Sequence, residues 1–106
     1  MPQVEAKKLK TTCWLNEALC EIKCEHWNEA IKCCNAVLEI ESKNVKALFR
    51  RGNAHFGKQE YQEALRDLTV AAELSPTNVE IKNMLAMCKM ASRAADRKQA
   101  RDSLSP

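Results

Sequence analysis

The sequence is poor in turn-forming and aromatic residues. Its 106 residues include two glycines and three prolines, and aromatic residues make up 5%. Because folds built from many short strands need frequent turns, this scarcity favours helices joined by short loops. The length limits the chain to one domain. No apolar run approaches the roughly 20 residues of a membrane-spanning helix, so we expect no membrane association.

Features of a secretory signal and of a nucleic-acid binder are also absent. Residues 1–10 contain three lysines but no apolar segment, unlike a signal peptide. We therefore expect a reducing, cytoplasmic setting. The net charge of +3 is too small to indicate nucleic acid by itself. No aromatic platform accompanies the basic residues, which argues further against a nucleic-acid partner.

What the sequence does contain is a repeat with a spacing of 34 residues. The matching pairs are Trp14 and Leu48, Ala18 and Gly52, Trp27 and Tyr61, Ala30 and Ala64, Cys34 and Leu68, Glu39 and Glu73, and Ile40 and Leu74. This spacing and order of bulky and small residues are typical of the tetratricopeptide repeat. Each repeat is a pair of helices that buries its apolar face by stacking on its neighbours. We therefore predict an all-α, right-handed solenoid.

Apolar periodicity predicts where the helices lie. The expected segments are residues 4–24, 28–40, 45–57, 61–74 and 79–101, all approximate. Asn28 and Asn78 are expected to cap the second and fifth helices. Gly52 is expected where paired helices approach closely.

These helices form one partial tetratricopeptide domain over residues 1–106. We assign a repeat to about 11–44, a second to about 45–78, a capping helix to about 79–101 and a disordered tail to 102–106. Such stacks usually need about three repeats. We therefore expect the chain to be the back half of a larger domain, with an uncovered first helix through which two copies associate as a homodimer.

Six cysteines are present, and we expect them to be free thiols. Without a secretory signal, a disulfide framework is not expected. Cys20 and Cys24 have the spacing of two zinc ligands on a helix, but no second pair completes a four-ligand set. We predict neither a metal nor another cofactor. Cys20 and Cys88 share the repeat position of Ala54, which predicts that both are small buried residues.

A polar stripe is predicted on the concave surface, which the first helix of each pair lines. Lys46, Arg50 and Asn53 are spaced i, i+4 and i+7 and so share one helix face. Asn16 is the repeat equivalent of Arg50. An ammonium, a guanidinium and an amide together suit a carboxylate ligand, with Asn53 as a weaker contributor. The alternative is that these are ordinary solvated charges.

Two segments carry a family resemblance, Leu15-Asn16-Glu17-Ala18-Leu19-Cys20 and Asn44-Val45-Lys46-Ala47-Leu48-Phe49-Arg50-Arg51-Gly52. Over roughly residues 7–90 the chain resembles the carboxyl-terminal tetratricopeptide domain of the large FKBP-type immunophilins and, less closely, that of cyclophilin-type and other co-chaperones.

This resemblance implies a carboxylate clamp for the Glu-Glu-Val-Asp terminus of the ninety-kilodalton heat-shock chaperone. The clamp residues present here are Asn16, Lys46 and Arg50. Two others in the family, a lysine and an asparagine of the preceding repeat, have no counterpart in this chain. The resemblance also implies a peptidyl-prolyl isomerase domain upstream.

The chain itself is not expected to be an enzyme. His26 and His55 lie apart in the pattern, and neither has a matched nucleophile with a third, orienting group. His55 takes the repeat's tyrosine position, which predicts packing at the core or its rim. We also expect an ion pair between Glu17 and Arg51 of neighbouring repeats.

Two other binding functions remain open. The fifth helix carries a basic set with neighbouring methionines, as a calmodulin target does: Met87, Lys89, Met90, Arg93, Arg97, Lys98 and Arg101. A solvated surface explains the same charges. The groove is also compatible with a scaffold for some other protein.

Overall fold

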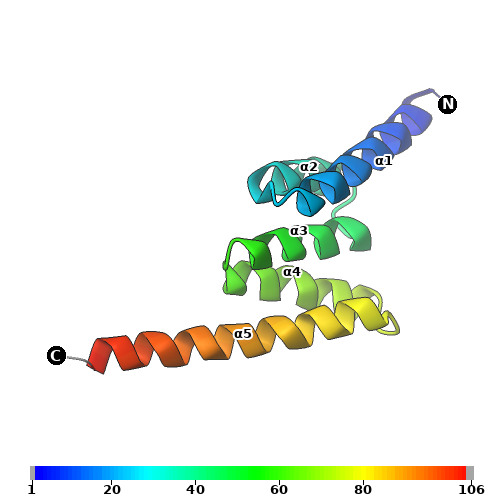
Figure 1. The fold of residues 1–106 in the computed structure, drawn as a ribbon. Helices are drawn as coiled ribbons and strands as arrows, with labels where there is room; N and C mark the ends of the chain where they lie inside the picture. The colour runs from blue at the N-terminus through cyan, green and yellow to red at the C-terminus, as the bar shows by residue number, and fades with distance from the viewer. Residues whose placement is uncertain (1, 105–106) are drawn as a thin grey trace.

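The computed structural model describes residues 2–104, and side chains over residues 6–101. It contains five helices: α1 (Pro2–Lys23), α2 (Trp27–Ile40), α3 (Val45–Gly57), α4 (Tyr61–Leu74) and α5 (Val79–Leu104). Helices α1 and α2 form one antiparallel pair, α3 and α4 stack on it as a second pair, and the long α5 packs on α4 (Figure 1). No strand occurs in the described range. The predicted all-α tetratricopeptide architecture is confirmed.

The helix boundaries follow the repeat closely. Helices α3 and α4 begin and end where the periodicity places them, and α1 begins at Pro2, since proline suits a first helical position. Helix α5 continues to Leu104, three residues beyond the predicted end. Residues 105–106 of the expected tail lie outside the described part of the chain.

Of the two predicted caps, one is confirmed and one is wrong. The Ile81 amide donates to Asn78 Oδ1 at 3.1 Å, so Asn78 does cap α5. Asn28 cannot cap α2 because the helix already starts at Trp27, after His26. The tight turn from α1 brings the chain into α2 one residue early, through Glu25 in the left-handed region at φ 60°.

Small residues let the helices approach closely, and a few larger side chains fill the space between them. Ala18, Ala30, Ala47, Ala54, Ala64 and Ala71 are all fully buried. Leu68, Ile81 and Val37 are the largest aliphatic side chains with almost no exposure. Consistent with the expectation for Gly52, a Cβ at that position would lie 2.9 Å from Leu68 Cγ.

The repeat position shared by Cys20, Ala54 and Cys88 is buried in α3 and α5 but exposed in α1. Cys88 is buried beneath α4, where its thiol donates weakly to the Tyr61 carbonyl at 3.7 Å. Cys20 is exposed, so the prediction for it is wrong. The covering helix for this repeat position comes from the preceding pair, and within residues 2–104 no helix precedes α1.

Thiol labelling is expected to divide the cysteines into two groups. Cys13, Cys20 and Cys24 are exposed, whereas Cys33, Cys34 and Cys88 are buried. Burial raises the pKa of Cys33 to about 11 and that of Cys34 to about 12, so thiolate is scarce there. At pH 8 a thiol reagent should titrate the exposed group quickly and the buried group slowly, with all six equivalent in denaturant. Fast labelling of Cys34 in the native protein would contradict this burial.

The second half of α5 runs past the ends of the shorter helices (Figure 1). Met87 and Met90 lie in the first half of α5 and are exposed, at 54% and 70%. The calmodulin alternative therefore stays a prediction. No helix in residues 2–104 combines the length and the apolar character that a bilayer crossing requires.

Candidate functional site

A groove of about 280 Å³ lies among α1, α3 and α5. Its lining consists of Leu19, Ile22, Val45, Lys46, Phe49, Arg50, Asn53, Asn78, Glu80 and Ile81. Five of these residues are aliphatic or aromatic, and α3 supplies the predicted polar stripe. The groove therefore combines apolar walls with a few polar groups, as ligand-binding clefts do.

Helix α3 brings Lys46, Arg50 and Asn53 to this groove because its start is fixed. The Ala47 amide donates to Asn44 Oδ1 at 2.9 Å, so Asn44 caps the helix. Counting from that cap, the three positions fall on one helix face. The structure thus places all three predicted α3 residues in the groove lining.

The two cations in the groove have no acidic partner among the described side chains. Arg50 Nη1 donates to the Leu15 carbonyl at 2.7 Å, which anchors the guanidinium between α3 and α1. That acceptor is neutral, so the positive charge of Arg50 stays uncompensated. The exposed Lys46 ammonium also takes part in none of the observed ion pairs within residues 6–101. Both cations are available to an anionic ligand.

Asn16 occupies a different place from the other predicted residues. It is exposed on α1 and is not part of the groove lining. It directly follows Leu15, whose carbonyl holds Arg50, and it lies one helical turn before the lining residue Leu19.

The structure adds two polar features to the predicted stripe. The Asn53 Oδ1 atom is buried and has no hydrogen-bond partner among the described side chains of residues 6–101. Glu80 lines the groove from the first turn of α5. The 34-residue register identifies Glu80 as the repeat equivalent of Lys46, but it does not show that Glu80 lines the groove. The burial of one Asn53 atom depends on packing alone.

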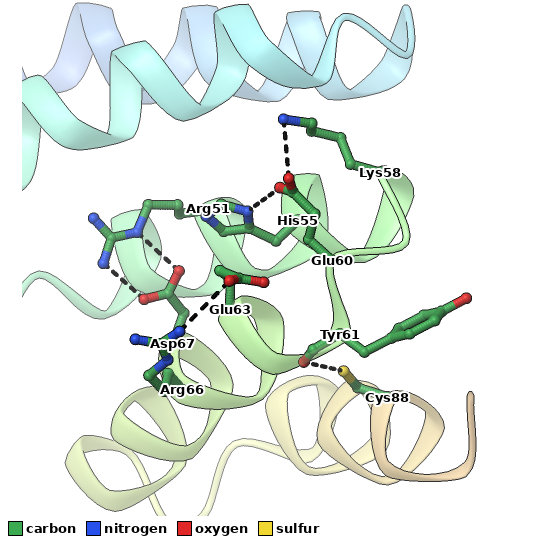
Figure 2. A network of polar contacts seen from close by, with 9 residues as sticks. All are labelled: Arg51, His55, Lys58, Glu60, Tyr61, Glu63, Arg66, Asp67 and Cys88. Carbon is green, nitrogen blue, oxygen red and sulfur yellow. Dashed lines mark hydrogen bonds and ion pairs between the residues drawn. The ribbon is translucent and has the colours of Figure 1, made fainter. Parts of the chain in front are cut away.

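Arg51 lies outside the groove and holds three helices together. Its Nε and Nη2 donate to the two carboxylate oxygens of Asp67 at 2.8 and 2.7 Å (Figure 2). Its Nη1 donates to Asn35 Oδ1 at 2.9 Å. The hydrogen bond to Asp67 raises the pKa of Arg51. The predicted Glu17–Arg51 ion pair is wrong, because Arg51 points to α2 and α4 and not to α1.

Both histidines have structural partners across the turns. His26 Nδ1 lies 2.8 Å from Glu21 Oε2, and His55 Nδ1 lies 2.8 Å from Glu60 Oε1 (Figure 2 shows the second pair). These are equivalent positions of the two repeats with acid and histidine exchanged. The hydrogen bond from His55 lowers the pKa of Glu60. His55 is half-buried, consistent with packing at the rim.

Comparisons with known proteins agree with this architecture. Residues 45–78 match the tetratricopeptide repeat family. Human peptidyl-prolyl cis-trans isomerase FKBP4 is 38% identical over 85 residues, which are 80% of this chain and 18% of that protein. Drosophila melanogaster FK506-binding protein 59 is 36% identical over 95 residues, covering 90% of this chain and 22% of the relative. The chain thus spans about a fifth of the length of these relatives.

Solved structures show the same fold. The C-terminal tetratricopeptide-containing domain of a Plasmodium falciparum FK506-binding protein superposes with a TM-score of 0.83 at 34% identity, over 86% of this chain and 60% of that domain. The UNC-45 chaperone, described as binding and folding muscle myosin, gives 0.82 at 26% identity, over 89% of this chain and 11% of that one.

The relatives contain more than the part that this chain matches. The isomerase activity in the names belongs to those proteins, whose tetratricopeptide part is what this chain matches. That part provides binding surface and not catalysis. The chain therefore contains a tetratricopeptide repeat at residues 45–78 and is similar over most of its length to the tetratricopeptide part of FKBP-type proteins, which is a protein-interaction module.

Proposed function

We propose that the groove binds the free carboxyl terminus of a partner protein, namely the acidic Glu-Glu-Val-Asp end of the ninety-kilodalton heat-shock chaperone. One observation carries the proposal: Lys46 and Arg50 line the same groove, and neither cation has an acidic partner among the described residues. A carboxylate supplies the missing charge. Charge-assisted hydrogen bonds of this kind are roughly twice as strong as neutral ones.

The individual residues have distinct roles in this proposal. The anchored Arg50 offers a rigid set of donors, while Lys46 offers a mobile ammonium. Asn16 contributes from the edge of α1, and Asn53 contributes more weakly from within the groove. The apolar walls, which include Phe49 and Ile81, suit an aliphatic side chain near the peptide terminus.

Replacing Lys46 with alanine is expected to weaken binding of a free-acid peptide by about 1–3 kcal/mol, because a charged donor is lost. The matched control is Lys32→Ala, since Lys32 is an exposed lysine on α2 paired with Glu29. Titration calorimetry measures the affinity of the wild type and of both variants for the free-acid and the amidated Glu-Glu-Val-Asp peptides. Equal binding of the two peptides would exclude the carboxylate clamp.

We further propose the wider setting of the domain. The repeats occupy about 11–44 and 45–78, followed by a cap at about 79–101, within a longer cytoplasmic protein that carries a peptidyl-prolyl isomerase domain. The FKBP relatives support this, because the chain matches only 18% to 22% of their length. In such a protein the preceding repeat supplies the remaining clamp residues.

A further inference from the structure

Glu80 introduces a negative charge into a groove that otherwise presents cations. It lines the same groove as Lys46 and Arg50, from the first turn of α5. Neither Glu80 nor Lys46 takes part in any ion pair seen within residues 6–101. The two side chains therefore form no direct ion pair with each other. Both remain available to a ligand.

Capping of α5 does not account for Glu80. An acidic residue in the first turn favours a helix through the helix dipole, an effect confined to that turn. At this helix, however, Asn78 already accepts the Ile81 amide at 3.1 Å. A dipole role would also be satisfied by a carboxylate facing away from the groove. The position of Glu80 in the lining points to a contact with the ligand.

The polar groups of the groove are ordered by charge. Helix α3 presents Lys46 and Arg50, and α5 presents Glu80. A ligand that crosses from α3 to α5 is matched when it is negative at one end and positive farther along. A uniformly acidic ligand would meet repulsion at α5, and a single small anion would leave Glu80 without a partner.

We propose that Glu80 is a specificity-determining residue that recognises a lysine or arginine side chain lying upstream of the acidic carboxyl terminus of the bound peptide. This inference rests on the proposed function, in which Lys46 and Arg50 hold that terminus. The preferred partner is thus a protein whose tail ends in acidic residues preceded by a basic one.

Peptides that differ in one charge test this inference. Each peptide ends in the same free-acid Glu-Glu-Val-Asp, and one of the five preceding positions carries lysine, glutamine or glutamate in turn. At one of these positions the lysine peptide should bind roughly two- to fivefold more tightly than the glutamine peptide, as expected for a partly exposed ion pair. The Glu80→Gln variant should lose this preference, and Glu80→Lys should favour the glutamate peptide.

A control variant, Glu73→Gln, and a control peptide with an amidated terminus separate the possible outcomes. Glu73→Gln removes an exposed carboxylate on α4, outside the groove lining, and should leave the lysine preference unchanged. If free-acid peptides bind better than amidated ones but wild type and Glu80→Gln rank the charges alike, the role of Glu80 is overturned while the clamp stands. If amidation has no effect, or no peptide binds, the proposed function fails and the Glu80 inference with it.

Discussion

Replacing Asp67 with alanine is expected to lower the free energy of unfolding by about 3–5 kcal/mol. The Asp67 side chain is 8% exposed and that of Arg51 is 27% exposed. Removing the carboxylate leaves the guanidinium largely buried with no charged partner, which costs far more than an exposed ion pair contributes. It also releases the link between α3 and α4 that Figure 2 shows.

Chemical denaturation of the wild type and the Asp67→Ala variant measures this loss. The matched control is Glu63→Ala, which breaks the ion pair of Glu63 with Arg66 on the same helix. That pair is exposed and 3.5 Å long, so the control should cost no more than about 1 kcal/mol. Equal losses in the two variants would show that the Arg51–Asp67 pair is not buried in solution.

The Leu68→Ala variant should be destabilised by about 2–5 kcal/mol, because a fully buried side chain is replaced by a cavity between α3, α4 and α5. Leu74→Ala, at a 40% exposed position on the same helix, should cost less. Thermal or urea unfolding compares the two variants. A similar loss at both positions would contradict the packing described for Leu68.

Gly52 allows a sharper test of the same contact. In the wild type, Gly52→Ala should be destabilising by about 1–3 kcal/mol, because the new Cβ would lie 2.9 Å from Leu68 Cγ and 3.1 Å from Cδ2. In the Leu68→Ala background those atoms are gone, and the added methyl group partly fills the cavity. The double variant should therefore be more stable than the sum of the single losses predicts. Simple additivity would argue against the contact.

The repeat made much of the fold predictable before any coordinates. Helices α3 and α4 have the predicted bounds because the 34-residue spacing records which positions face the stack. The same register indicated the close approach at Gly52. It failed for Cys20, because burial at that position depends on a neighbouring helix and not on the residue itself.

Contacts of long polar side chains were less predictable. Arg51 can reach toward several neighbouring helices, and repeat register alone suggested Glu17 as its partner. The acceptors found in the structure are Asp67 and Asn35, 16 residues away on either side. Buried carboxylates are rare, so composition offered no reason to place Asp67 inside.

The candidate site likewise combines features that the sequence predicted with features that only tertiary packing determined. The spacing of Lys46, Arg50 and Asn53 on a single helix was sufficient to place them on one face, because helical periodicity is a local property of the chain. Tertiary packing decided that Asn16 lies outside the groove lining, that Asn53 Oδ1 is buried with no partner among the described residues, and that Glu80 lines the groove with the two cations. These features depend on how separate helices pack together, which local periodicity does not specify.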